Sequence, residues 1–85
     1  MITVVLPSLL AAEAGGRKRF EVEAATVGDA LRALPVADLL FDEHGELRRL
    51  VNVYVDGTDA RAREGTATVV RGDETILVLQ AVAGG

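Results

Sequence analysis

The sequence predicts an α+β fold in which one main helix packs on one face of a mixed sheet of four to five strands. Apolar, β-branched segments at residues 2–6 and 75–80 are typical of buried strands that pair in parallel at the centre of a sheet. Between them lie an alternating segment at residues 19–23 and a segment with helical periodicity after Thr26. A hairpin, one helix and further strands, in that order, indicate a helix that covers one face of the sheet.

The first half of the predicted hairpin is the segment Ile-Thr-Val-Val-Leu at residues 2–6, which ends at Pro7 because proline has no backbone N–H to donate. Residues 8–14 favour a weak helix or a loop, and the glycines at 15–16 mark a turn. Residues 19–23 alternate polar and apolar side chains, which is typical of a half-buried strand. Together these segments predict an N-terminal hairpin with a long connection.

The main helix is predicted to begin after Thr26, whose hydroxyl can accept a hydrogen bond from a free N–H group of the first turn. Asp29, three residues later, completes a weak capping box. Apolar residues then recur at the spacing of one helix face, and they are Val27, Ala30, Leu31 and Leu34. Pro35 ends this helix.

The middle of the chain predicts a second short helical turn at residues 37–41 and a polar loop at 42–46. Residues 50–55, Leu-Val-Asn-Val-Tyr-Val, form the clearest strand in the sequence. Its three valines face one way, and Asn52 and Tyr54 face the other way, because side chains alternate along a strand.

The C-terminal part contains two more turn signals. Asp-Gly at residues 56–57 predicts a tight turn, and the polar segment 58–63 after it predicts a short edge strand. Residues 71–74 predict another turn, which we expect Asp73 to shape. The last strand follows at residues 75–80.

Composition excludes several classes of function. The 85 residues are enough for one domain, which we place at residues 1–80, with residues 81–85 as a flexible tail. The net charge of −4 is unfavourable for binding nucleic-acid phosphates, and the lack of cysteine excludes disulfides and thiolate metal sites. No segment reaches the ~20 apolar residues that span a bilayer, and the first residues lack the basic region of a signal peptide. We therefore expect a cytoplasmic protein without a membrane or nucleic-acid partner.

The sequence ends in Ala-Val-Ala-Gly-Gly, and the carboxylate of Gly85 is the main candidate for chemistry. An α-carboxyl group has a pKa of roughly 3.3–3.7, so it is ionised at neutral pH and can attack the α-phosphate of ATP. Glycine has no Cβ, which lets another protein's backbone come close. The five tail residues span at most about 17 Å, so we predict that Ala81, Val82, Ala83 and Gly84 enter the active site of a partner. An inert, frayed end is the alternative.

Few other side chains suggest a function. His44 lies in a polar segment without another histidine or a cysteine, so a surface position is favoured over a metal site. Tyr54 is predicted to be partly exposed, and both a cover for the sheet and a docking contact remain open for it. Leu77 and Leu79 would lie beside Tyr54 and complete an apolar patch near the tail, which would indicate a partner-docking surface.

These features together resemble the ubiquitin-like (β-grasp) sulfur carrier proteins, which include the small subunit of molybdopterin synthase and the sulfur carrier of the thiamine pathway. The resemblance covers nearly the whole chain and rests on Val-Asn at 51–52, Gly-Asp at 72–73 and the terminal diglycine at 84–85. The branch most similar to this chain is the actinobacterial one that serves cysteine biosynthesis. This closer resemblance rests on the segments 50–55 and 81–85 and on three single residues. The single residues are Asp59, Arg61 and Gly65.

The chain departs from the family pattern near its last strand. Many members have proline where this chain has Gln80, and one more residue lies here between Gly-Asp at 72–73 and the diglycine. We expect a bulge in the last strand to accommodate that residue, and the register of residues 76–79 stays open.

The resemblance implies a carrier that is not itself an enzyme and that binds no cofactor or metal. A partner of the ubiquitin-activating type would adenylate Gly85 with ATP and magnesium, and a sulfur donor would convert the product to a thiocarboxylate. The sulfur would pass to a biosynthetic enzyme of a cysteine, thiosugar, molybdopterin or thiamine pathway. Two alternatives stay open, namely a protein modifier conjugated through the same end and a β-grasp interaction module with an inert tail.

Overall fold

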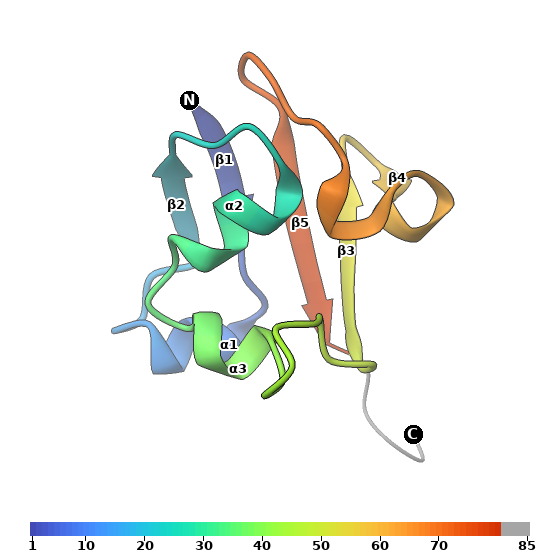
Figure 1. Ribbon diagram of the computed structural model, residues 1–85. Helices are drawn as coiled ribbons and strands as arrows, with labels where there is room; N and C mark the ends of the chain where they lie inside the picture. Colours follow the sequence, from blue (N-terminus) through green and yellow to red (C-terminus); the bar gives the residue numbers. More distant parts are fainter. Residues whose placement is uncertain (81–85) are drawn as a thin grey trace.

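Five strands form one mixed sheet in the order β2-β1-β5-β3-β4 (Figure 1). The structure is a computed structural model, and it describes residues 1–80. The strands are β1 (Ile2–Val5), β2 (Arg19–Val22), β3 (Val51–Val55), β4 (Thr58–Asp59) and β5 (Thr75–Gln80). Strand β5 is central, since it pairs in parallel with β1 and antiparallel with β3. The predicted α+β architecture and the parallel pairing of the first and last strands are confirmed.

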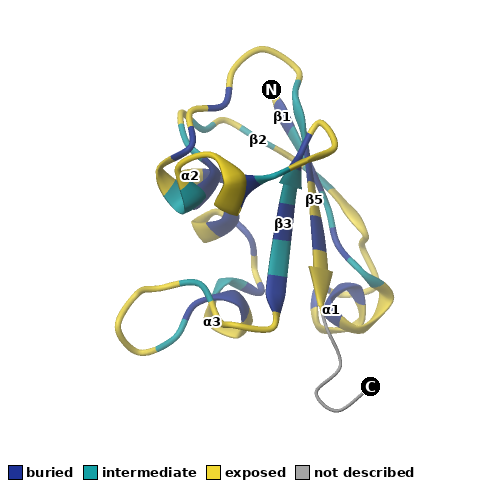
Figure 2. Cartoon of the chain, turned by 90° about the vertical axis from the view of Figure 1, so that its right-hand side faces the viewer, coloured by how far each residue is buried: buried dark blue, intermediate teal, exposed yellow. Residues whose placement is uncertain are grey.

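Three short α-helices accompany the sheet: α1 (Ser8–Glu13), α2 (Val27–Arg32) and α3 (Ala37–Leu40). Helices α2 and α3 lie on the same side of β3 (Figure 2). Helix α1 forms where the sequence favoured a weak helix or a loop, and it buries Leu10 and Ala11. Two 3-10 turns, η1 (Ala60–Ala62) and η2 (Gly65–Ala67), follow β4.

The start of α2 has the predicted cap. The hydroxyl of Thr26 accepts a hydrogen bond from the backbone N–H of Asp29 at 3.1 Å, which satisfies one of the free donors of the first turn. The predicted apolar face is buried in full, and it packs against the sheet. The buried residues are Val27, Ala30, Leu31 and Leu34, the last of which lies just beyond α2, since the helix ends at Arg32 and not directly before Pro35.

The core lies between this helix face and one face of the sheet. Every second side chain of the central strands points into the core, because successive side chains of a strand point to opposite faces of the sheet. The strand residues in the core are Ile2, Val4, Val51, Val53, Val55, Ile76 and Val78.

The pairing of β5 is regular, so the predicted bulge is wrong for this strand. Five consecutive pairs join it to β3, from Val51 with Gln80 to Val55 with Ile76. Ile76 is buried, whereas Leu77 is exposed. The register that the sequence left open is therefore the one that buries residues 76 and 78 and exposes residues 77 and 79.

Both turn signals of the C-terminal part are confirmed. Asp56 and Gly57 have positive φ angles of 48° and 88°, which is the conformation of the tightest hairpin turns. Before β5, Gly72 has a φ angle of 66°. The side chain that stabilises this turn is Glu74, whose Oε1 accepts from the N–H of Arg71 at 2.7 Å, and not the expected Asp73.

The segment between β4 and β5 contains structure that the sequence analysis did not predict. The expected edge strand at residues 58–63 is limited to the two residues of β4, and the chain then turns through η1, where Ala60 is buried. Further along, Thr68 is fully buried. Its carbonyl accepts from the N–H of Val27 at 3.0 Å, and its hydroxyl accepts from the N–H of Glu64 at 3.1 Å. This segment is therefore attached to the first turn of α2.

We expect Thr68→Val to lower the free energy of unfolding by about 1–2 kcal/mol, because the substitution keeps the side-chain size but leaves the N–H of Glu64 without its acceptor. Chemical denaturation of both proteins measures this difference. Thr58→Val is the matched control, since Thr58 is exposed at the sheet edge. Equal stability of Thr68→Val and the control would contradict the structural role of this hydroxyl.

Candidate functional site

The site is built around Gln80, the last residue of β5. Gln80 is exposed and pairs with Val51. The predicted reactive residue Gly85 and the predicted tail residues Ala81, Val82, Ala83 and Gly84 lie outside the described residues. What the structure shows is the surface beside the start of that tail.

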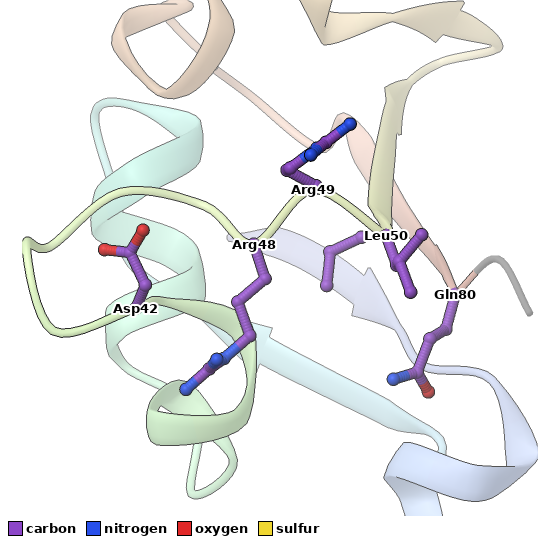
Figure 3. A pocket seen from close by; sticks show the side chains of 6 residues that line it. Asp42, Arg48, Arg49, Leu50 and Gln80 are labelled. Atoms are coloured by element: carbon purple, nitrogen blue, oxygen red, sulfur yellow. The ribbon is translucent and has the colours of Figure 1, made fainter. Parts of the chain in front are cut away.

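A shallow pocket of about 340 Å³ opens beside Gln80 (Figure 3). It lies where the loop after α3 meets the first residues of β3. The lining residues are Asp42, Arg48, Arg49, Leu50, Val51 and Gln80, and we call this feature the tail-root groove. No motif in the sequence predicted this groove. The available signal was the arginine pair directly before the clearest strand, but nothing local placed that pair beside the last strand.

The single carboxylate of the tail-root groove is bound to its own turn. Asp42 Oδ1 accepts from the backbone N–H groups of His44 at 2.8 Å and Glu46 at 3.0 Å. These two hydrogen bonds hold the pKa of Asp42 below its usual value. The bond from Glu46 has the larger effect and the bond from His44 a smaller one, while partial desolvation acts in the opposite direction. Asp42 is therefore ionised at neutral pH.

The two arginines of the groove are exposed. A guanidinium nitrogen of Arg48 donates to the carbonyl of Asp38 at 3.5 Å. The carboxylate of Asp42 and the guanidinium of Arg48 point away from each other, and Arg49 extends in a different direction from Arg48 (Figure 3). The groove thus presents two positive charges against one negative charge, in a chain whose net charge is −4.

Arg61 holds the backbone that forms one wall of the groove. Its guanidinium donates to the carbonyls of Arg49 at 3.1 Å and Val51 at 3.0 Å, and to Oδ1 of Asn52 at 2.9 Å. Strand β4 pairs with Tyr54 and Val55, and within residues 1–80 no strand pairs with the first residues of β3 on that side. The arginine supplies donors to two backbone carbonyls at this exposed edge, which covers part of it.

The predicted docking residues Tyr54, Leu77 and Leu79 lie together on the sheet face opposite the core. Tyr54 pairs directly with Leu77, and Asn52 pairs with Leu79. Leu77 and Leu79 are 38% and 41% exposed, and Tyr54 is half-buried. Their predicted proximity is confirmed, and their role in docking stays a prediction.

Residues 1–80 contain no group of three or more histidine, cysteine, aspartate or glutamate side chains arranged to hold a metal ion. No helix in this part of the chain is long and apolar enough to cross a membrane. His44 is exposed in its loop, as expected.

Comparison with known proteins identifies the family. Residues 4–85 match the model of the ThiS family. The chain belongs to the ThiS family. The sulfur carrier protein CysO of Mycobacterium tuberculosis is 33% identical over 91 residues, which cover 99% of this chain and 98% of that protein.

Solved structures of similar proteins have the same fold. The crystal structure of Mycobacterium tuberculosis CysO gives a TM-score of 0.86 at 30% identity and covers 96% of this chain and 100% of that one. A chain of the Amycolatopsis orientalis BexX/CysO complex gives 0.84 at 32% identity, with full coverage of both chains. SAMP1 of Haloferax volcanii gives 0.77 at 32% identity, with coverage of 99% and 98%. The predicted ubiquitin-like β-grasp fold and the predicted family are confirmed.

The lowered pKa of Asp42 gives a prediction for the pH dependence of stability. A carboxyl group whose pKa is lower in the folded state stabilises the fold at neutral pH, and this contribution is lost as the pH falls through the folded-state pKa. We therefore expect Asp42→Asn to lose less stability than the wild type between pH 7 and about pH 3. Thermal unfolding across this range, with an NMR titration of the carboxyl carbon, measures the effect. Parallel pH profiles would contradict it, and Asp38→Asn serves as the control for a neighbouring exposed carboxylate.

Proposed function

We propose that this chain is a sulfur carrier whose Gly85 carboxylate is converted to a thiocarboxylate by partner enzymes and then gives its sulfur to a biosynthetic enzyme. Membership of the ThiS family is the observation that carries this proposal, since the family match runs to residue 85 and includes the diglycine. The 33% identity to a protein named as a sulfur carrier supports it further. The chain acts in this scheme as a protein substrate and not as an enzyme.

The first step is activation of the carboxylate. An oxygen of ionised Gly85 attacks the α-phosphorus of ATP, the bond to the leaving pyrophosphate breaks, and an acyl adenylate forms. ATP and magnesium are bound by the activating partner, of the ubiquitin-activating type, and this chain supplies only the tail.

The second step loads the sulfur. With sulfide as the donor, hydrosulfide adds to the acyl carbon and AMP leaves, so the product is a thiocarboxylate. The ionised sulfur then attacks an activated carbon of the acceptor held by a biosynthetic enzyme, and the bond from that carbon to its leaving group breaks. Hydrolysis of the bond between the acyl group and the product restores the carboxylate and completes the cycle.

The position of the tail on the fold suits this chemistry. Strand β5 carries the tail directly, and it is bound on one side by β1 and on the other by β3. Buried Ile76 and Val78 anchor it to the core. A partner that binds the tail is therefore joined directly to a strand that is paired on both sides and anchored in the core.

Relatives support the involvement of partner enzymes. The CysO chain of Amycolatopsis orientalis was solved in a BexX/CysO complex. By analogy, we propose that this chain forms complexes with an activating enzyme and with a sulfur-accepting biosynthetic enzyme, and that the patch of Tyr54, Leu77 and Leu79 contacts them.

A protein modifier is the second candidate. The similarity to SAMP1 of Haloferax volcanii, a small archaeal modifier protein, favours it at 32% identity. Activation by adenylation is common to both functions. They differ in the group that attacks the acyl carbon, which is sulfur for a carrier and a lysine amine for a modifier.

Intact-mass spectrometry distinguishes these functions. We expect incubation with the host's activating enzyme, ATP, magnesium and sulfide to raise the mass of the free chain by the difference between one sulfur and one oxygen. Deletion of Gly85 should abolish this change and is the matched control. Covalent conjugates with lysines of other proteins would favour the modifier instead. A wild-type chain that forms no adenylate would contradict both and favour an interaction module.

We expect Tyr54→Ala to raise the KM of the activating enzyme for this chain by about 5- to 10-fold, since an aromatic contact at an interface commonly contributes more than 1 kcal/mol. Pyrophosphate release at varied carrier concentration measures KM and kcat. Glu21→Ala is the control. Glu21 belongs to the same sheet, but it lies on the edge strand β2, where it pairs with Thr3 of β1, away from Tyr54. A large loss of thermal stability with an unchanged KM would show that Tyr54 is structural.

A further inference from the structure

The position of Gln80 limits where an enzyme that uses Gly85 can bind. Five residues follow Gln80, and they reach at most about 17 Å when fully extended. Gln80 itself lines the tail-root groove. An enzyme whose active site holds the end of the tail must therefore place its surface close to this groove.

The chemistry of the groove defines what that surface must offer. Arg48 and Arg49 are exposed and contribute two positive charges. In the one carboxylate of the groove, that of Asp42, Oδ1 accepts from two backbone N–H groups of its own turn, so it contributes one negative charge against the two positive charges. Leu50, which is 44% exposed, adds an apolar contact between the arginines and β3. A complementary surface is therefore acidic and partly apolar.

The arginines are presented from a fixed backbone. The carbonyl of Arg49 accepts from Arg61, and the N–H of Val51 donates to the carbonyl of Arg48 at 3.0 Å. Because these bonds involve backbone atoms, they hold the segment in place and leave the guanidinium of Arg49 available to a partner. A side chain held on an ordered segment loses less conformational freedom on binding than one on a mobile loop.

We propose that the tail-root groove binds an acidic, partly apolar segment at the rim of the activating enzyme's active site. This inference rests on the proposed function, because it assumes that Gly85 is adenylated. The groove lies on the loop side of Gln80, whereas Tyr54, Leu77 and Leu79 lie on the open sheet face. The two surfaces contact the activating enzyme on different sides of Gln80, and the arginines speed and orient the encounter.

Charge reversal at Arg49 tests the proposal. We expect Arg49→Glu to raise the KM for the carrier by about 3- to 10-fold at low salt while kcat stays unchanged, because charges at the rim of an interface mainly affect association. The double variant Arg48→Glu/Arg49→Glu should show a larger effect. The ratio of the KM of each variant to the KM of the wild type should fall as salt rises from about 50 to 500 mM, because salt screens the interaction between the charges. Direct binding to the activating enzyme without ATP gives a second readout.

Arg71→Glu is the matched control, since it changes the net charge equally but lies before β5, at the opposite end of this strand from Gln80. Equal KM values for Arg49→Glu and Arg71→Glu would overturn the proposal. Normal adenylation of Arg49→Glu with slower sulfur delivery would also overturn it, because the groove would then serve the accepting enzyme. Failure of the wild type to become adenylated would instead overturn the proposed function.

Discussion

The pairing of β5 with β1 on one side and β3 on the other is the constraint on which the rest of the structure depends. Residues of a strand alternate between the two faces of a sheet, so a slip by one residue would exchange every buried and exposed side chain. The observed register buries Ile76 and Val78 and exposes Leu77 and Leu79. It thereby fixes both the core and the open face, and it places Gln80 beside the first residues of β3.

An apolar surface and a charged surface lie near Gln80. One is the open sheet face, where Leu77 lies directly opposite Tyr54. The other is the tail-root groove, which carries exposed arginines in an acidic chain. Arg61 connects them, since it covers the edge of β3 that the short strand β4 leaves open and bonds both Asn52 and the carbonyl of Arg49. In the proposed complexes, an apolar patch and a charged groove near Gln80 would contribute affinity and orientation respectively.

A carrier of the ThiS family needs little chemistry of its own. The reacting group in the proposed cycle is a backbone carboxylate, and the catalytic groups belong to the enzymes that load and unload it. In this proposal the folded domain is the part that the partner enzymes recognise. This division explains why a chain without cysteine and with a single histidine can take part in sulfur transfer.

Elements with local signals could be predicted from the sequence alone. The cap at Thr26 and the apolar face after it follow from helix geometry, and the alternation at residues 51–55 follows from strand geometry. The sequence also indicated the diglycine end and the exposure of Tyr54. The burial of Thr68, the register of β5 and the tail-root groove were decided only by the tertiary structure. Each depends on contacts between segments far apart in the chain, such as Val51 with Gln80, and no local periodicity encodes which distant segments become neighbours.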